Sequence, residues 1–393
     1  MKGDFETLAD RKNSGSKKWI FMERENSKID DHTVPLTVAD MEFLMARELV
    51  DSLKSFIEEN TLGYMLPQDS YFEALMTWME RRNSYKIEKD WIIPTPGVKP
   101  GFTASLRALA KEGDGVIINL PSYGPMVEAI EDSKLKLVNI PLINKDMHYE
   151  FDFEGFEKAC KDPKNKIFLF CSPHNPTGRV FTYDELKRIS DICLKNDIII
   201  ISDEIWSDFI RPGFKYIPIA SISKETEDIT ITCHSASKTF NIAGLACANL
   251  IIKNKDLREK VRCELHHMRA DVVNGLGLLA TETAYRKCEY WLDELIEVLE
   301  ENRKIGEEFF KKHDLPVTRA EGTYLLWVDF SKLGMDNEKL KEFLQGEGSF
   351  YASDGLSFGK EGNCYRRINM ALPSRDFKVQ LDMLEKALMR IKN

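Results

Sequence analysis

A single lysine, Lys238, lies in the stretch CHSASKTFNIAG, between small hydroxyl residues and a glycine. It closely follows the β-rich run DITITC, so we expect it where a strand ends in the interior of a domain. A buried lysine is costly unless it is paired or loses its charge. Either Lys238 is a surface residue or it is used chemically. The positions of the other polar residues distinguish these two alternatives.

Polar residues follow three other apolar runs in the same way. Tyr123 comes after GVIINL, Asn175 after IFLFCS and Asp203 after DIIIIS. Ligands of open α/β sheets bind beyond the carboxyl ends of the strands, so these side chains are expected to share one site. Each has a plainer alternative: a packed surface aromatic, a common turn composition, and a helix cap, respectively.

A glycine turn adds a possible anion site. The segment TPGVKPG, with Gly97, Val98 and Lys99, leads into the helical pattern FTASLRALAK. Backbone amides at such a turn and helix start can hold a phosphate, although an ordinary loop is equally compatible with the composition. Ser235 and Ser237, which flank the lysine stretch, offer further hydroxyl donors.

Together these residues match the requirements of pyridoxal 5'-phosphate (PLP). A lysine amine forms a Schiff base with its aldehyde. A carboxylate keeps the pyridine nitrogen protonated, so that the ring can accept electrons. A hydrogen-bond donor steadies the phenolic oxygen, an aromatic ring stacks on the cofactor, and amides and hydroxyls hold the phosphate. The sequence therefore predicts a PLP site built on Lys238.

The elements that must position these residues follow from the hydrophobic pattern. Continuous apolar runs alternate with amphipathic stretches such as TYDELKRISDICLKN, which indicates a parallel sheet covered on both faces. We expect residues 46–275 to form a large doubly wound α/β domain. Residues 1–45, together with 276–393, are expected to form an N-terminal arm and a smaller α+β domain that contains the strands TYLLWVDF and CYRRINMAL.

Composition narrows the class of protein. The chain has 393 residues and a net charge of −9, with no basic tract, so nucleic acid and membrane surfaces are not expected partners. There is no apolar run of membrane-spanning length and no signal-peptide pattern. Eight cysteines are scattered without a C-x-x-C pair and the seven histidines lack metal-ligand spacing, so we expect reduced thiols, no metal and a cytoplasmic protein.

The chain resembles fold-type I PLP enzymes of the class I/II aminotransferase superfamily, and most closely the MalY/PatB group of cystathionine β-lyase-like proteins. The matching stretches run in family order over nearly the whole chain: VADMEF at 38–43, GYMLP at 63–67, SPHNPTGRVF at 172–181, SDEIWSDF at 202–209, SASKTFNIAGL at 235–245, TYLLWVDF at 323–330 and RINMALP at 367–373. The resemblance implies a mainly parallel seven-stranded sheet in the large domain and a homodimer.

The resemblance also implies roles for the cofactor-binding residues. Lys238 would carry the cofactor and later move protons at the substrate, while Asp203 would bind the pyridine nitrogen. Asn175 would donate to the phenolic oxygen and Tyr123 would stack on the ring. The phosphate ligands would be Gly97, Val98, Ser235 and Ser237, with Tyr64 reaching in from the second subunit. Lys99 would add charge to that site, and a solvated lysine is the alternative.

For the substrate, the resemblance implies that Arg367 clamps the α-carboxylate, because its planar fork matches a carboxylate. Asn175 and the backbone around Ala39 would close over the same group. A surface ion pair is the plain alternative for Arg367, and Arg366 is the neighbouring competitor.

Two departures from the family pattern bear on the reaction. Class I aminotransferases usually carry an arginine eight residues after the lysine, where this chain has Ala246; the β-lyase-like group also lacks it. After SDEI the lyase-like group usually has histidine and many aminotransferases have tyrosine, whereas this chain has Trp206. An indole can only donate a hydrogen bond and is bulky, so Trp206 would alter the cofactor surroundings or simply pack nearby.

The predicted function is a PLP-dependent carbon–sulfur β-lyase that acts on the amino acid cystathionine or a related cysteine conjugate and releases pyruvate, ammonia and a thiol. The alternative is an aminotransferase that moves an amino group to a 2-oxo acid. Lys238, Asp203 and Arg367 serve both reactions. A third interpretation, a regulatory protein that binds a partner through the same fold, is disfavoured by the intact catalytic positions.

Overall fold

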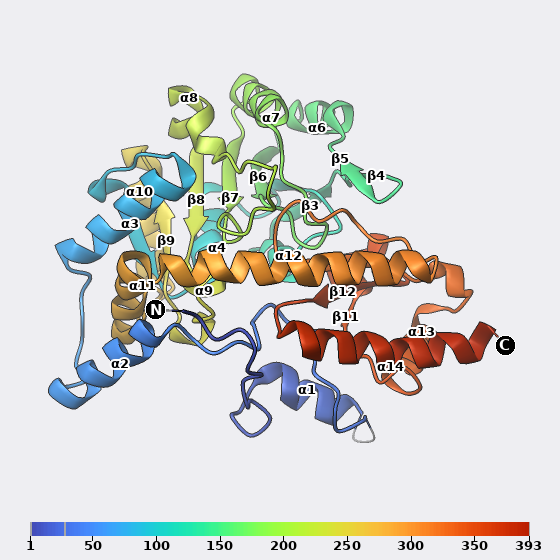
Figure 1. Ribbon diagram of the computed structural model, residues 1–393. Helices are drawn as coiled ribbons and strands as arrows, with labels where there is room; N and C mark the ends of the chain where they lie inside the picture. Colours follow the sequence, from blue (N-terminus) through green and yellow to red (C-terminus); the bar gives the residue numbers. More distant parts are fainter. Residues whose placement is uncertain (1, 27–28, 393) are drawn as a thin grey trace.

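The computed structural model describes residues 2–26 and 29–392, and its centre is a seven-stranded sheet (Figure 1). The strand order is β1-β9-β8-β7-β6-β2-β3. The strands are β1 (Ile92–Thr95), β2 (Gly115–Ile118), β3 (Lys136–Asn139), β6 (Asn165–Cys171), β7 (Ile199–Asp203), β8 (Thr230–His234) and β9 (Ala248–Ile251). This confirms the predicted α/β class and the seven-stranded sheet.

The direction of the strands places the predicted residues at one edge. Pairs β3/β2, β2/β6, β6/β7 and β7/β8 are parallel, whereas β9 runs antiparallel to both β8 and β1. All strands except β9 therefore point the same way, including β1. The carboxyl ends of β1, β2, β6, β7 and β8 lie on the same side of the sheet, where ligands of such sheets bind.

Both faces of the sheet are covered, as the continuous apolar runs predict. Along β6, Ile167 and Leu169 belong to one hydrophobic cluster and Phe168 and Phe170 to another, because successive side chains point to opposite faces. The first cluster includes residues of α4 (Val98–Leu109), and the second includes residues of α6 (Phe153–Cys160) and α7 (Tyr183–Lys195). The sheet is thus held rigidly between two helical layers.

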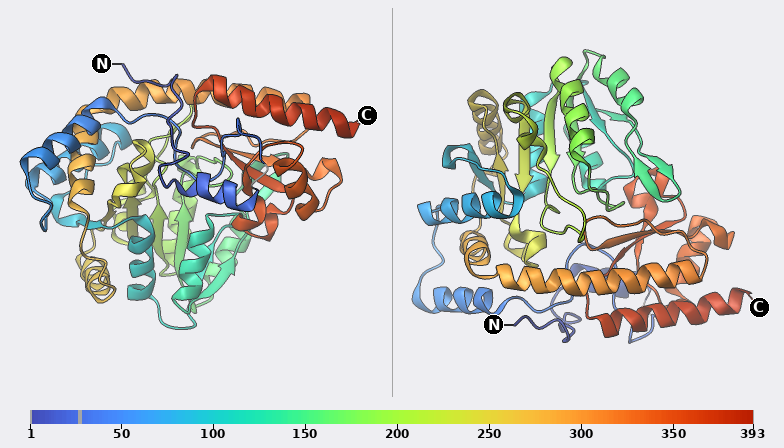
Figure 2. Two further views of the ribbon diagram at one scale, coloured as in Figure 1. Left: turned by 90° about the horizontal axis from the view of Figure 1, so that it is seen from below. Right: turned by 45° about the horizontal axis from the view of Figure 1, so that its top comes forward.

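The remaining helices include several that lie outside these layers. Helices α2 (Arg47–Glu59) and α3 (Asp69–Asn83) pack against α11 (Gly275–Lys287). The long helix α12 (Glu289–Lys312) crosses in front of the sheet, and α14 (Ser374–Lys392) runs beside it (Figure 1, Figure 2). The other α-helices are α1 (Lys17–Glu25), α5 (Gly124–Asp132), α8 (Lys224–Asp228), α9 (Ala236–Thr239), α10 (Lys255–His267) and α13 (Asn337–Gln345).

A second, antiparallel sheet follows α12 in sequence. Its order is β10-β12-β11, formed by β10 (Leu325–Asp329), β11 (Ser353–Asp354) and β12 (Tyr365–Asn369), and a separate hairpin joins β4 (Ile143–Lys145) to β5 (His148–Glu150). The predicted strands TYLLWVDF and CYRRINMAL are therefore present as β10 and β12. The domain division at residue 275 stays a prediction.

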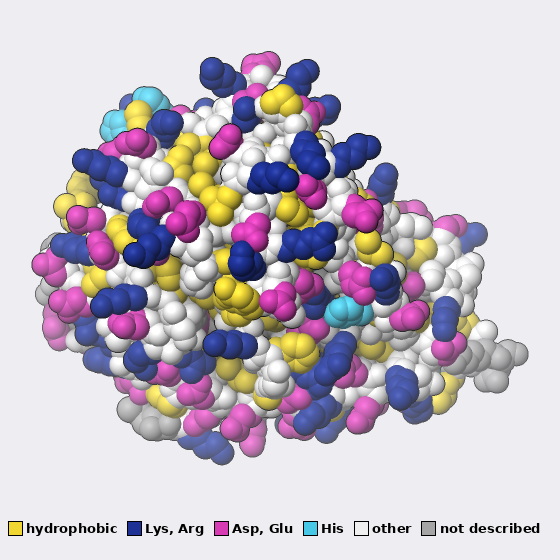
Figure 3. Space-filling model, turned by 90° about the horizontal axis from the view of Figure 1, so that it is seen from above, with side chains coloured by type: hydrophobic (Ala, Val, Ile, Leu, Met, Phe, Trp, Pro, Cys, Tyr) yellow, Lys and Arg dark blue, Asp and Glu magenta, His cyan; other side chains and the backbone are white. Residues whose placement is uncertain are grey.

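The surface and the cysteines agree with the composition. On the face shown in Figure 3, basic and acidic side chains are interspersed. No described helix is long and apolar enough to cross a membrane. All eight cysteines are free, and seven of them are buried. Within the described residues, no group of three or more His, Cys, Asp or Glu residues could hold a metal ion.

Candidate active site

A cavity of about 620 Å³ opens at the carboxyl ends of the strands, between the large sheet, the segment before α2 and the second sheet. It gathers most of the predicted residues. Those that line it are Ala39, Gly97, Val98, Lys99, Tyr123, Asn175, Asp203, Trp206, Ser237, Lys238 and Arg367. Residues from seven separate stretches of the chain thus meet in one place.

Lys238 lies on the short helix α9, directly after β8. It is half-buried because it faces the cavity, and its Nζ donates a 2.6 Å hydrogen bond to the Ala39 carbonyl. Burial lowers the pKa of Lys238 to about 8, which the charge of Asp40 partly offsets. A substantial fraction of the amine is therefore neutral near physiological pH, as a nucleophile or base requires.

Asp203 is the last residue of β7 and is buried. Among the described residues its carboxylate accepts one hydrogen bond, from the Ile205 amide at 3.2 Å. Burial raises the pKa of Asp203 to about 6, against the opposing effects of this amide and of Lys238. A buried carboxylate with so few donors is suited to a cationic partner in the cavity.

Arg367, on β12, forms the opposite wall. Its Nη1 donates to Asn175 Oδ1 at 3.0 Å, and its guanidinium lies 4.7 Å from the centre of the Phe358 ring. Its Nε is buried and has no hydrogen-bond partner within the described part of the chain. Burial lowers the pKa of Arg367 to about 10. An arginine with an unused donor is prepared for a carboxylate ligand.

The neighbouring Arg366 points to the other face of β12, as strand alternation requires. Its Nη1 donates to Asn337 Oδ1 at 2.9 Å and lies 3.4 Å from Asp354 Oδ1. Arg366 does not line the cavity. The structure thus places Arg367 rather than its competitor in the candidate site.

The glycine turn opens α4, and its conformation requires glycine. Gly97 has a φ of +134°, which side chains other than glycine rarely adopt, and no side chain caps the helix that begins at Val98. The free amides of this helix end can bind an anion. Ser237 lies on the same cavity wall.

Ser235 is buried and, unlike Ser237, does not line the cavity. Its Oγ accepts from the Ser237 amide at 3.0 Å, donates to the Cys247 carbonyl at 2.7 Å and lies 2.8 Å from Ser237 Oγ. The hydroxyl of Ser235 is therefore occupied in shaping the start of α9. A capping bond turns this side chain toward the backbone, and its predicted contact with a phosphate stays a prediction.

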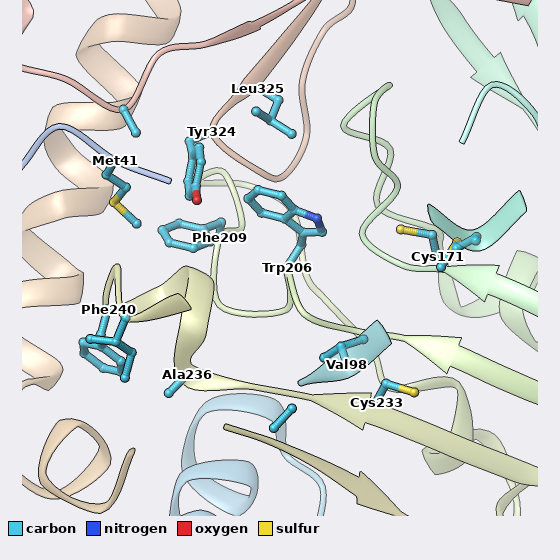
Figure 4. Packing of buried hydrophobic residues seen from close by; sticks show 14 of the residues in the cluster. Met41, Val98, Cys171, Trp206, Phe209, Cys233, Ala236, Phe240, Tyr324 and Leu325 are labelled. Atoms are coloured by element: carbon cyan, nitrogen blue, oxygen red, sulfur yellow. The ribbon is translucent and has the colours of Figure 1, made fainter. Parts of the chain in front are cut away.

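Trp206 follows β7 and is only 2% exposed, yet it contributes to the cavity wall. Its ring packs edge-on against Tyr324, with centroids 4.8 Å apart, and lies near Phe209 (Figure 4). Tyr123, which precedes α5, is half-buried at the same cavity. Burial raises the pKa of Tyr123, so its ring stays neutral.

Two predicted residues differ from the rest in their surroundings. The Lys99 ammonium is 2.7 Å from Glu128 Oε2 in an exposed ion pair at the cavity rim, so its charge is already compensated. Tyr64 does not line the cavity and is fully exposed on the segment before α3.

Sequence reasoning missed several cavity residues. They include Thr37, Phe102, Ser353, Ser357 and Phe358, and Tyr324 supports the wall by donating to the Ala39 carbonyl at 3.0 Å. Thr37, Ser353, Ser357 and Phe358 come from segments with no chemical motif of their own, and Phe102 and Tyr324 belong to quoted stretches in which no role was assigned to them. Only the pairing of the second sheet, in which Ser353 lies beside Arg367, could have signalled one of them.

The arrangement fits PLP on structural grounds. Its features are a lysine amine of lowered pKa, a buried carboxylate with one amide donor, an arginine with a free donor and an uncapped helix start, all around one cavity. Fold and cavity together define an enzyme of the fold-type I PLP class.

Comparisons with known proteins agree with this assignment to the fold-type I PLP class. The profile described as aminotransferase class I and II matches residues 32–384. Cystathionine beta-lyase PatB of Bacillus subtilis (strain 168) is 33% identical over 339 residues, which cover 86% of this chain and 87% of PatB. The chain belongs to the class I and II aminotransferase family.

Solved structures show which members of the family this chain is similar to. Cystalysin from Treponema denticola, whose crystal structure contains a pyridoxal 5'-phosphate cofactor, superimposes with a TM-score of 0.98 and 41% identity, with both chains fully covered. The PLP-bound C-S lyase from Staphylococcus hominis gives a TM-score of 0.91 and 29% identity, with 99% of this chain and 98% of that one covered. The predictions of the fold type, of PLP and of a carbon–sulfur β-lyase class are confirmed.

Proposed function

We propose that this enzyme breaks the Cβ–S bond of cysteine-derived amino acids such as L-cystathionine and releases a thiol, pyruvate and ammonia. The observation that carries the proposal is the meeting of Lys238, Asp203 and Arg367 around one cavity. Relatives named cystathionine beta-lyase and C-S lyase support the choice of bond.

Several residues would hold the cofactor. Lys238 would bind it covalently, Asp203 would pair with its pyridine nitrogen, Asn175 would donate to its phenolic oxygen and Tyr123 would face its ring. The phosphate would meet the amides of Gly97 and Val98 and the hydroxyl of Ser237, which Ser235 positions. When bound, the cofactor supplies an electron sink for the carbanion at the substrate Cα.

The chain's own residues then bind the substrate and move its protons. Arg367 would bind the α-carboxylate, because its side chain lines the cavity and its fork matches the two oxygens. Lys238 would take the Cα proton of the bound amino acid through its neutral Nζ. The electron pair left on Cα would form a Cα=Cβ bond as the electron pair of the Cβ–S bond leaves with sulfur. The proton held by Lys238 would then be available to the departing thiolate, and one water would convert the remaining three-carbon enamine to pyruvate and ammonia.

An aminotransferase is the second candidate, favoured by the family to which the chain belongs. Both reactions begin with removal of the Cα proton by the same lysine. Ala246 occupies the position where class I aminotransferases carry a phosphate-binding arginine, and this favours the lyase.

The test is pyruvate release from L-cystathionine by the PLP-loaded enzyme, with and without 2-oxoglutarate. Pyruvate and ammonia without the acceptor establish β-elimination. Amino transfer only in the presence of an acceptor, across a panel of amino acids, would overturn the lyase assignment. Lys238→Ala should abolish either activity, whereas Lys12→Ala, which changes an exposed side chain of the N-terminal arm, should not.

We also propose that two copies of the chain form the working unit and that the enzyme is cytoplasmic. Tyr64, Leu62 and Leu66 form an exposed apolar segment that a second copy would cover. The free, mostly buried cysteines fit a reducing compartment.

A further inference from the structure

The segment 38–42 begins at the cavity wall, which Val38 and Ala39 line, and Lys238 contacts it directly. The Ala39 carbonyl accepts hydrogen bonds from Lys238 Nζ at 2.6 Å and from Tyr324 at 3.0 Å. The backbone here is constrained, because Val38 has a φ of +57°, in the left-handed region. Asn369 Nδ2 donates to the Asp40 carbonyl at 2.7 Å. The position of this segment therefore determines the hydrogen-bond partner of Lys238 Nζ.

Four charges hold the segment from behind. Lys18 Nζ, on α1, lies 2.7 Å from Glu42 Oε1 and 3.3 Å from Asp40 Oδ1. It also donates to the Asp40 carbonyl at 3.0 Å. Arg11 reaches Asp40 Oδ2 at 2.7 Å and Glu42 Oε1 at 2.8 Å. Lys18 and Glu42 are each only 1% exposed, whereas the Arg11 and Asp40 side chains are each 21% exposed, so the Lys18–Glu42 pair is the buried centre of the network.

The network is electrically balanced next to the reacting amine. Two cations face two carboxylates, and burial of Asp40, which alone would raise its pKa, is outweighed by Lys18 and Arg11, so the pKa of Asp40 is lowered. The charged groups that act on Lys238 are Asp40, Arg367, Asp203 and Lys18. Loss of one buried cation would leave an uncompensated negative charge close to Lys238.

We propose that Lys18, with Arg11, is a positioning residue for the reaction: it fixes the 38–42 segment over the substrate carboxylate and balances the charge beside Lys238. This role rests on the proposed function, since it concerns the same site. Lys18 does not itself line the cavity. It acts through Asp40 and Glu42, which places control of the active site in the N-terminal arm.

The test compares PLP-loaded Lys18→Met and Lys18→Arg enzymes with the wild type and with Lys12→Met. Lys12 lies on the same arm but forms an exposed ion pair with Asp31, so it is a matched control. Lys18→Met should raise KM for L-cystathionine on the order of tenfold, because a small misplacement of a binding wall is costly. The KM of Lys18→Arg should lie close to that of the wild type, and the KM of Lys12→Met should equal it.

A second readout separates positioning from mere stability. The excess negative charge in Lys18→Met favours protonated Lys238, so the acidic limb of the kcat profile should move to higher pH. The pH titration of the bound cofactor's visible absorbance, which needs no turnover, should move the same way. A lowered melting temperature with KM and both pH dependences unchanged would overturn the proposal.

The double variant Lys18→Met/Glu42→Gln guards against a misfolded single variant, because it leaves no unpaired charge at that place. Its pH dependences should return toward those of the wild type, while KM stays raised. If both KM and the pH dependences match the wild type, the positioning role is refuted. Failure of the wild type to release pyruvate would count against the proposed function instead, and the absorbance titration would still decide the role of Lys18.

Discussion

At the scale of single residues, Arg367 has a hydrogen-bond donor that no described residue uses. Its Nη1 is engaged by Asn175 while its Nε has no partner among the described residues. Lys cannot supply two parallel donors, so Arg367→Lys should raise KM about 10- to 100-fold, equivalent to the ~1.5–3 kcal/mol of a charged hydrogen bond. Steady-state kinetics with L-cystathionine would show this, and the exposed Arg262→Lys serves as the control. An unchanged KM would mean that the carboxylate binds elsewhere.

His234, at the end of β8, sets a pH-dependent contribution to stability. Burial lowers the pKa of His234 to about 4, below the ~6.5 of an unfolded chain. As the pH falls from about 6.5 to 4, the histidine of the unfolded chain binds a proton while the buried His234 stays neutral. The free energy of unfolding therefore decreases across this pH range. Between pH 7 and 5, His234 should lower the free energy of unfolding by about 2 kcal/mol.

The measurement is urea unfolding at pH 7 and pH 5 for the wild type and His234→Gln. Between pH 7 and pH 5, the free energy of unfolding of His234→Gln should fall by about 2 kcal/mol less than that of the wild type. For His32→Gln, which changes an exposed histidine, the decrease should equal that of the wild type. Burial raises the pKa of Asp203 to about 6 and of Glu204 to about 7, which acts in the opposite direction. For this reason the difference between the two proteins, rather than the wild-type slope, isolates His234. Equal pH dependence in both would refute the assignment.

The sequence was informative at this scale wherever a residue directly follows a strand. Asp203 and Lys238 were predicted because strand ends of a parallel sheet share an edge. Phe358, which lines the cavity, and Tyr324, which supports its wall, were not predicted, because the pairing and packing of the second sheet place them there. The capping bond that turns Ser235 away also depends on atomic geometry that composition does not carry.

At the scale of elements, the apolar runs predicted the central strands because those strands are buried on both faces. The reversed direction of β9 and its pairing with β1 could not be inferred, since Ile92 pairs with Ile251 across most of the large sheet's sequence. That pairing is nevertheless what brings the glycine turn after β1 to the site.

A buried ion pair joins two loops at the same scale. Glu321 Oε2 accepts from Arg179 Nη1 at 3.0 Å and from the Val180 amide at 2.9 Å. The loop of Arg179 also carries Asn175, so this contact connects the loop of Asn175, which lines the cavity, to the segment before β10. Glu321→Ala leaves a buried guanidinium partly unpaired and should cost about 3 kcal/mol.

Urea unfolding of the enzyme checks this value. Glu157→Ala, which removes an exposed ion pair with Lys161, is the control and should cost less than about 1 kcal/mol. A loss for Glu321→Ala as small as that of the control would show that the loops are held by packing alone.

At the scale of the whole molecule, the site is spread over more of the chain than its motifs suggest. The N-terminal arm, the large sheet and the second sheet all contribute walls. The motifs predicted the lysine, the carboxylate and the arginine, but the buried charges of Arg11 and Lys18 carry no motif. Their significance appears only when the arm is seen against the 38–42 segment.

The exposed Tyr64 gives the prediction that belongs to the assembly. If each site takes Tyr64 from the partner copy, Tyr64→Ala and Lys238→Ala homodimers should both be severely impaired. A mixed dimer has one damaged site that carries both substitutions and one site with both residues native. Random reassociation makes half the dimers mixed, so equal mixing should recover about one quarter of wild-type activity.

The measurement is pyruvate release after the two variants are unfolded together and refolded with PLP, with each variant refolded alone as the control. Recovery requires that Tyr64 and Lys238 of one site come from different chains, because a site built within one chain would stay defective in every combination. No recovery, while size-exclusion chromatography shows dimers and wild-type enzyme regains activity by the same procedure, would place Tyr64 outside the partner's site. Recovery near one quarter would instead make the dimer an obligatory part of the catalytic apparatus, since neither chain then contains a complete site.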